Sequence, residues 1–174
     1  MPTRYQCFEP IINEQTITLI LGSLPSPLSL QHHQYYGNPN NKFWTIVYDL
    51  FAQTLPDLDY RARCQFLLHH GLGLWDVFSS AEREGAADAK IQNPKVNDFL
   101  TLFIEYPRIK RLVFNGATAE TFFLHAYPGL GRELHCIRAM STSPAYACKY
   151  EIKLENWRHA LMINTEKDLP NSKV

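Results

Sequence analysis

Four short apolar runs, separated by segments with helical periodicity, constrain the fold of this chain more than any other feature. They lie at 16–26 (TITLILGSLPS), at 72–78 (LGLWDVF), at 109–116 (IKRLVFNG) and at 133–145 (ELHCIRAMSTSPA). Apolar runs of this length, bounded by Gly and Pro, predict buried β-strands. Strands that alternate with helices predict a parallel sheet covered by helices on both faces.

Helical spacing of apolar side chains occurs in five segments, which span residues 41–55, 60–71, 96–107, 117–127 and 150–163. We expect Gly71 to terminate the second helix, since glycine favours the left-handed backbone at a helix end. Asn97 or Asp98 is expected to cap the start of the third helix. The charged stretch EREGAADAKIQNP (82–94) predicts a solvated loop able to fold over a ligand.

Size and composition indicate an ordinary globular protein with a single domain over residues 1–174. We expect a core over about residues 15–164 and a polar C-terminal tail. No apolar run approaches twenty residues and the N-terminus lacks an apolar signal core, so neither a membrane span nor export is expected. Four scattered cysteines without a Cys-x-x-Cys pair favour free thiols in a reduced cytoplasmic compartment.

Charge is balanced overall, with 17 basic and 17 acidic residues. Residues 1–87 carry five Lys or Arg and eight Asp or Glu, whereas residues 88–174 carry twelve and nine. A strong nucleic-acid binder is often plainly basic, so composition alone does not indicate DNA. It leaves room for a local basic face along a short track of phosphates.

Polar residues follow three of the predicted strands, at the edge where parallel sheets bind ligands. GSLPS suits a ligand site but is also common turn chemistry. Ser141–Ser143 offer hydroxyls and exposed backbone amides, which suit a phosphate or a helix cap equally well. Asn115 can contact a base edge through its donor and acceptor, or can be a turn residue with left-handed backbone. Asp76 suits either a catalytic carboxylate or the anchor of a loop.

Other catalytic schemes and metal sites are disfavoured. The pairs His32–His33 and His69–His70 are adjacent in sequence, so their rings point apart on a helix and lack metal-ligand spacing. No G-x-S-x-G elbow, P-loop or G-x-G-x-x-G motif occurs. We therefore expect a mechanism that uses no metal and no cofactor.

One set of motifs resembles a known family. The segments LILGSLPS, QYYGNPNNKFW (34–44), GLGLWDVFSSAEREGAADAKIQNPKVNDF, RLVFNGATAETFF, STSPAYA and KLENWR occur in this order. Together they resemble, collinearly over roughly residues 17–160, the hypoxanthine-DNA glycosylase branch of the uracil-DNA glycosylase superfamily. The resemblance implies a three-layer α/β/α sandwich around a four-stranded parallel sheet. Glycosylases flip the target nucleotide out of DNA into a pocket.

The resemblance also implies roles for individual residues near the flipped base. Asn41, the asparagine of the Asn-x-Phe-Trp element, is expected to orient the attacking water, because Leu24 stands where uracil glycosylases usually carry an Asp or Asn. Asn115 matches the asparagine that contacts the base, and Tyr36 the ring that stacks on it. Ser23 and Leu24 are expected beside the base. Asn38 and Asn40 are expected only to support the loop.

The last motif departs from the uracil enzymes, because Ser141 stands where those enzymes place a histidine. The resemblance therefore implies a slower enzyme with weak or no activity on uracil. The expected phosphate contacts are Pro25, Ser26, Ser141, Thr142 and Ser143.

The implied function is a monofunctional glycosylase that removes hypoxanthine from deoxyinosine in double- or single-stranded DNA, acts as a monomer and leaves an abasic site. Within the elements to which the resemblance assigns site residues (GSLPS, QYYGNPNNKFW, FNG and STSPA), Lys42 is the one lysine, so a Schiff-base lyase is not expected. Two alternatives stay open: action on other deaminated bases such as uracil or xanthine, or a weakly active or non-catalytic protein that binds nucleic acid or a free nucleobase.

Overall fold

A four-stranded parallel sheet forms the centre of the protein, as the four apolar runs predict. The structure is a computed structural model that describes residues 3–162, so the predicted polar tail lies outside the described residues. The strands are ordered β3-β2-β6-β7 and all pair in parallel. Their bounds are Thr18–Gly22 (β2), Leu72–Asp76 (β3), Arg111–Asn115 (β6) and His135–Ala139 (β7).

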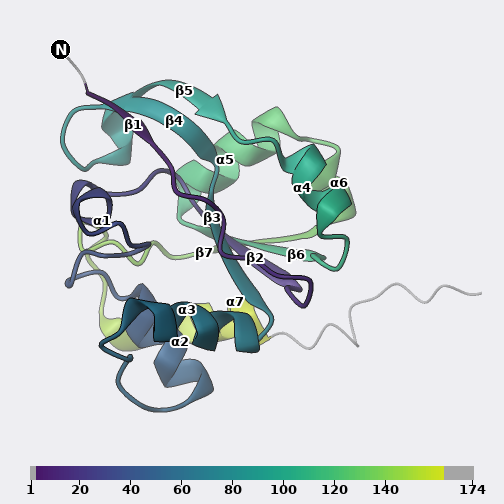
Figure 1. Ribbon diagram of the computed structural model, residues 1–174. Helices are drawn as coiled ribbons and strands as arrows, with labels where there is room; N and C mark the ends of the chain where they lie inside the picture. The colour runs from purple at the N-terminus through teal and green to yellow at the C-terminus, as the bar shows by residue number, and fades with distance from the viewer. Residues whose placement is uncertain (1–2, 163–174) are drawn as a thin grey trace, which may run out of the picture.

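Helices cover both faces of this sheet, which confirms the predicted three layers (Figure 1). One face is covered by α2 (Phe43–Phe51), α3 (Tyr60–His69) and α7 (Tyr150–Met162). The other is covered by α4 (Phe99–Glu105), α5 (Ala117–Ala126) and α6 (Leu130–Glu133). In residues 3–162, no helix is long and apolar enough to cross a membrane.

Alternating side chains of the central strands build the two apolar cores. In β2, Leu19 and Leu21 belong to the core beneath α4 and α5, whereas Ile20 belongs to the core beneath α2 and α7. In β6, Leu112 belongs to the core beneath α4 and α5, and Val113 belongs to the core beneath α2 and α7. Successive residues of a strand point to opposite faces, so a strand with two covered faces must be apolar throughout. This is why these runs could be recognised in the sequence.

Local capping rules also predicted helix ends correctly. The Asp98 carboxylate accepts a hydrogen bond from the Thr101 backbone N–H (3.1 Å) at the start of α4. Gly71 follows α3 with a φ of +69°, the left-handed backbone that glycine adopts most readily. The short helix α1 (Pro27–His32), which periodicity did not indicate, begins behind the N-cap Ser26.

A second, antiparallel sheet was not predicted. It contains β1 (Thr3–Gln6), β4 (Phe78–Arg83) and β5 (Ile91–Val96) in the order β1-β4-β5. The prediction of a continuous loop over 82–94 is therefore wrong at both ends, where the chain pairs as strands. Between them lies the single 3₁₀ turn η1 (Asp88–Lys90). Residues before 15 also join the fold, through β1 and a bridge between Ile11 and Leu74.

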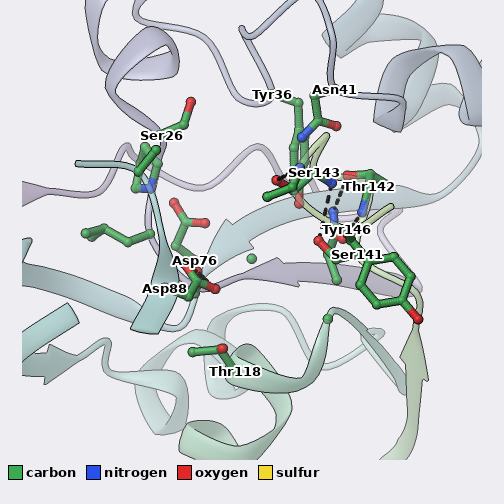
Figure 2. A pocket seen from close by; sticks show the side chains of 18 of the residues that line it. Ser26, Tyr36, Asn41, Asp76, Asp88, Thr118, Ser141, Thr142, Ser143 and Tyr146 are labelled. Atoms are coloured by element: carbon green, nitrogen blue, oxygen red, sulfur yellow. Dashed lines mark hydrogen bonds between the residues drawn. The ribbon is translucent and has the colours of Figure 1, made fainter. Parts of the chain in front are cut away.

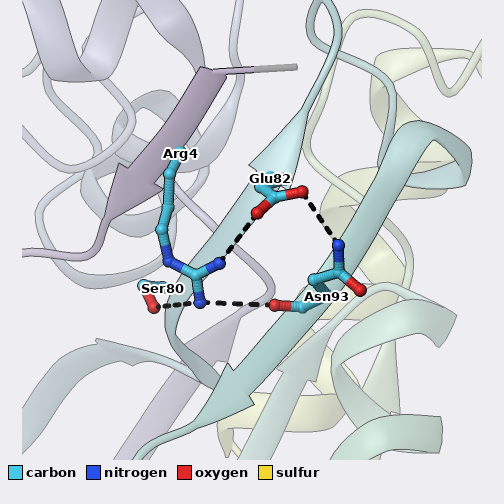
Figure 3. A network of polar contacts seen from close by, with 4 residues as sticks. All are labelled: Arg4, Ser80, Glu82 and Asn93. Atoms are coloured by element: carbon cyan, nitrogen blue, oxygen red, sulfur yellow. Dashed lines mark hydrogen bonds and ion pairs between the residues drawn. The ribbon is translucent and has the colours of Figure 1, made fainter. Parts of the chain in front are cut away.

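Polar contacts across three strands hold this second sheet together (Figure 3). The Arg4 guanidinium donates to the Glu82 carboxylate (3.1 Å), the Ser80 hydroxyl (3.1 Å) and the Asn93 carbonyl (3.4 Å). The Asn93 side chain donates to the other Glu82 oxygen (2.8 Å). These groups are polar, and all but Ser80 are at least partly exposed, so hydrophobic periodicity gave no sign of the strands that carry them.

Candidate active site

A cavity of about 680 Å³ opens at the carboxyl ends of the parallel strands. The last residues of all four strands line it, as expected for a parallel sheet. The structure brings together every site residue expected from the sequence, and Figure 2 shows several of them. They are Ser23, Leu24, Pro25, Ser26, Tyr36, Asn41, Asn115, Ser141, Thr142 and Ser143.

Asn41 lies in the loop just before α2. Its Oδ1 accepts a hydrogen bond from the Phe43 backbone N–H (2.9 Å), which fixes the side chain against the helix start. The next residue, Lys42, donates its backbone N–H to the Thr142 carbonyl (3.1 Å), so this loop is joined to the serine-rich turn. Asn38 and Asn40 do not line the cavity, and the Asn38 side chain accepts from the Asn40 N–H instead (2.9 Å).

Tyr36 has one ring face covered by Phe43, with ring centroids 4.1 Å apart and planes inclined by 26°. Its φ of +54° is rare for a residue other than glycine, and it places the ring within the cavity wall. The hydroxyl hydrogen-bonds to the Asn115 side chain, and burial raises its pKa above the ordinary value. The opposite ring face is thus the one on which a planar ligand can stack.

Asn115 is held in one orientation by Thr142. Its Oδ1 accepts from the Thr142 backbone N–H (2.9 Å), and its Nδ2 donates to the Thr142 hydroxyl (2.8 Å). The alternative of a left-handed turn residue is wrong, because the positive φ of +96° belongs to Gly116. Thr142 is fully buried, and its hydroxyl and backbone N–H are both bonded to Asn115, so the expected phosphate contact of Thr142 stays a prediction. Its role is to position the Asn115 carboxamide.

The serine-rich turn is closed by its own side chains. The Ser141 hydroxyl accepts from the Ser143 backbone N–H, and the Ser143 hydroxyl accepts from the Ala145 N–H, both at 3.2 Å. The expected exposed amides are therefore not found at Thr142 and Ser143, whose N–H groups bond to the side chains of Asn115 and Ser141. No helix begins in this turn, so the alternative of a helix cap is wrong. The hydroxyl protons of Ser141 and Ser143 remain available as donors. Lys153 fixes the turn from below by donating to the Tyr146 carbonyl (3.0 Å).

Asp76, which the sequence left between two interpretations, is a buried carboxyl in the cavity wall. The residue is 4% exposed, and its Oδ2 has no hydrogen-bond partner among the described residues. Its backbone carbonyl accepts from the Asn97 side chain (2.8 Å), which fixes the end of β3. Burial raises the pKa of Asp76 to about 8, with a further contribution from the charge of Asp88 and an opposing one from Arg83.

The β4–β5 hairpin contributes groups that the sequence did not identify. The Ser23 hydroxyl donates to both carboxylate oxygens of Asp88 (2.9 and 2.8 Å). Arg83 is buried and donates to the carbonyls of Pro25 (2.5 Å) and Gly85 (3.0 Å). The hairpin therefore folds over the GSLPS segment, and its tip lines the cavity. In the sequence, this placement of the hairpin was indicated by the charged stretch 82–94 alone, which we expected to fold over a ligand.

The assembled site suits a flat heterocycle with hydrogen-bonding edges. Tyr36 offers a ring face, Asn115 a donor and an acceptor, and Asp76 a carboxyl that is mostly protonated at pH 7. Hydroxyls and one exposed cation, Arg138, line the same cavity, and Arg138 pairs with Glu120 (3.3 Å). A pocket with a stacking surface and a few converging polar groups is typical of ligand binding.

Comparisons with known proteins agree with this description. A protein of Methanosarcina barkeri (strain Fusaro) named hypoxanthine DNA glycosylase is 42% identical over 111 residues, which cover 64% of this chain and 70% of that protein. A protein of Methanosarcina acetivorans with the same name is 43% identical over 115 residues, which cover 66% and 73%. No protein-family model matches the chain.

A solved structure supports the fold. The solution NMR structure of a Methanosarcina acetivorans protein, described as a candidate uracil DNA glycosylase, superposes with a TM-score of 0.80 at 34% identity. The match covers 91% of this chain and 97% of that one, so the similarity extends over both sides of the cavity.

Proposed function

The chain belongs to the hypoxanthine DNA glycosylase family, and we propose that its cavity excises hypoxanthine from DNA by hydrolysing the N-glycosidic bond of deoxyinosine. The observation that carries the proposal is the identity of 42–43% to two proteins of that name, combined with a cavity lined by every site residue that the motifs led us to expect. The product is an abasic site. The enzyme acts as a monomer on double- or single-stranded DNA.

A flipped base would be bound by stacking and by its lactam edge. The base stacks on the free face of Tyr36, whose other face is already supported by Phe43. The Asn115 carboxamide accepts a hydrogen bond from the lactam N–H and donates one to the lactam carbonyl. With the base bound, these bonds replace the hydrogen bond between Asn115 and the Tyr36 hydroxyl. Thr142 keeps the carboxamide from rotating, because its hydroxyl accepts and its N–H donates.

Asn41 orients the attacking water. One lone pair of its Oδ1 is used by the Phe43 N–H, so the Nδ2 group and the remaining lone pair are free for a water molecule. A carboxamide is not a general base, and its contribution is positioning and a fixed dipole. That is sufficient when the leaving base itself delocalises the negative charge that develops on it.

The phosphates on either side of the flipped nucleotide are contacted by serines from two segments. The Ser141 and Ser143 hydroxyls are free to donate, whereas the Ser26 hydroxyl donates to the Ser29 Oγ (3.0 Å) and has to exchange that partner for a phosphate oxygen. Ser26 lies on one side of the cavity, and Ser141 and Ser143 lie on the other (Figure 2). Because the lining hydroxyls are neutral, most of the charge attraction to DNA comes from exposed cations such as Arg138.

The test is cleavage of a labelled duplex that carries one deoxyinosine, followed by alkali to break the strand at abasic sites. Wild-type protein should give a single break, and Asn41→Ala should slow it by roughly 100-fold or more, as when a positioned amide is removed from other active sites. Asn40→Ala is the matched control, since Asn40 is exposed and lies outside the cavity.

Absence of a break with excess wild-type protein would reject the proposal. Equal rates for Asn41→Ala and Asn40→Ala would reject the role of Asn41 alone. Parallel duplexes with uracil or xanthine measure the substrate range. We expect weak or no cleavage of uracil, because Ser141 supplies only a hydroxyl where an imidazole would stabilise the leaving oxygen.

A further inference from the structure

Asp76 is a buried polar residue of the cavity wall that has no role in the chemistry proposed above. It is 4% exposed, lies at the end of β3 in the cavity wall, and has an Oδ2 without a hydrogen-bond partner in residues 3–162. A buried oxygen without a partner destabilises the folded protein. A bound ligand would supply the partner that the protein lacks.

The position of Asp76 places it beside the groups that contact the base. In the sheet it is the neighbour of Gly22 on β2. A Cβ on Gly22 would lie 2.6 Å from the Asp76 Oδ1 and 3.4 Å from the Tyr36 hydroxyl oxygen. The absence of a side chain at Gly22 therefore leaves the space that the Asp76 carboxyl occupies. The Tyr36 hydroxyl borders the same space and contacts Asn115.

The surroundings favour the neutral form of the carboxyl. Burial is the main cause that raises the pKa of Asp76 to about 8, and the negative charge of Asp88 adds to it. Arg83 opposes the shift, but its guanidinium donates to the Pro25 and Gly85 carbonyls rather than to Asp76. The other titratable groups that interact with Asp76 carry no charge near pH 7, since burial raises the pKa of each: Cys7, Tyr35 and Tyr36.

We propose that Asp76 acts as a neutral carboxylic acid whose O–H donates a hydrogen bond to the departing hypoxanthine, an inference that rests on the function proposed above. The bond between C1′ and the base breaks, and both electrons stay on the base. The water oxygen bonds to C1′, and its proton passes to the base through solvent, so Asp76 keeps its own proton. A donor at the base stabilises the developing charge more than it stabilises the bound substrate.

This role differs from that of a general base. An ionised carboxylate would take a proton from water, and asparagine could not replace it. A neutral acid offers an O–H donor beside a carbonyl acceptor, and an asparagine carboxamide offers an N–H donor beside a carbonyl of similar size. The two roles therefore predict opposite results for Asp76→Asn.

The experiment measures single-turnover cleavage of the deoxyinosine duplex at pH 6, 7, 8 and 9 with wild type, Asp76→Asn and Asp76→Ala. We expect Asp76→Asn to stay within about ten-fold of wild type at pH 7, and Asp76→Ala to lose roughly 100-fold or more. The wild-type rate should fall as pH rises above 8, as the carboxyl ionises. The asparagine variant should lack this fall.

A fourth variant tests the neighbouring charge. Asp88→Asn keeps an oxygen that can accept from Ser23 but removes the negative charge that raises the pKa of Asp76. Its alkaline fall in rate should therefore begin at lower pH than in wild type. Thermal unfolding of each variant verifies that it is folded.

Three results would overturn the inference while the enzyme stays active: loss of cleavage in folded Asp76→Asn, an alkaline fall that persists in that variant, or full activity in Asp76→Ala. Failure of the wild-type protein to cleave deoxyinosine is a different result. It overturns the proposed function itself, and with it any role of Asp76 toward the leaving base.

Discussion

Replacing Asp76 by asparagine should change how the stability of the fold depends on pH. In the folded protein the pKa of Asp76 is raised from 3.8 to about 8, mainly by burial. At any pH between these two pKa values, Asp76 is therefore protonated in the folded state and ionised in the unfolded chain. Because release is favoured at higher pH, the free energy of unfolding of the wild type falls as pH rises through this window.

The size of the effect follows from the window. One proton contributes about 1.4 kcal/mol per pH unit well inside it. Between pH 6 and pH 8 the wild type should lose about 2 kcal/mol relative to Asp76→Asn, since the slope declines as the pH approaches the folded pKa. The extra N–H group of asparagine adds an offset that does not depend on pH, so the slope is the diagnostic quantity.

Urea unfolding at pH 6, 7 and 8, followed by tryptophan fluorescence, measures this slope. Glu14→Gln is the matched control, because Glu14 is an exposed acid away from the cavity. A stability difference between wild type and Asp76→Asn that stays constant from pH 6 to pH 8 would refute the assignment of a protonated carboxyl. The groups that titrate in both proteins cancel in the difference.

Two other substitutions test the supports of the site. Thr142→Val keeps the shape of the side chain but leaves the Asn115 N–H without its acceptor. A buried donor without an acceptor costs about 1–3 kcal/mol, so kcat/KM for deoxyinosine should fall at least five-fold. Thr142→Ser keeps the hydroxyl and should restore kcat/KM. Gly116→Ala adds a Cβ 3.3 Å from the Ser141 Cβ, at a φ of +96° that strains any residue with a side chain. Thermal and urea unfolding should show that the free energy of unfolding falls by roughly 1–3 kcal/mol. An unchanged free energy of unfolding would contradict backbone strain at this position.

The central sheet and the place of the site could be predicted because their causes are local or topological. A strand covered on both faces must be apolar throughout, as β2 and β6 are. The carboxyl ends of parallel strands meet at one edge, so Asp76 and Asn115 had to be near each other. The cap of α4 by Asp98 is a contact over three residues, which the sequence shows directly.

The remaining features depend on contacts between distant residues. The antiparallel sheet pairs Arg4 with Glu82, and its outer strands β1 and β5 are largely exposed and carry polar groups that resemble a loop in sequence. The hydrogen bond between the Thr142 hydroxyl and Asn115 joins two residues that are far apart in sequence, and no local pattern reveals the burial of Thr142. The protonation of Asp76 likewise depends on how the chain closes around it.

Chromatographic detection of the released base is the most direct test of the central claim. A duplex with one deoxyinosine, incubated with excess wild-type protein at pH 7, should yield free hypoxanthine and an abasic strand in equal amounts, with no strand break until alkali is added. A matched duplex with deoxyadenosine at the same position should release no base. Recovery of the intact deoxyinosine strand, with no free hypoxanthine, would contradict the assignment of this cavity as a glycosylase active site.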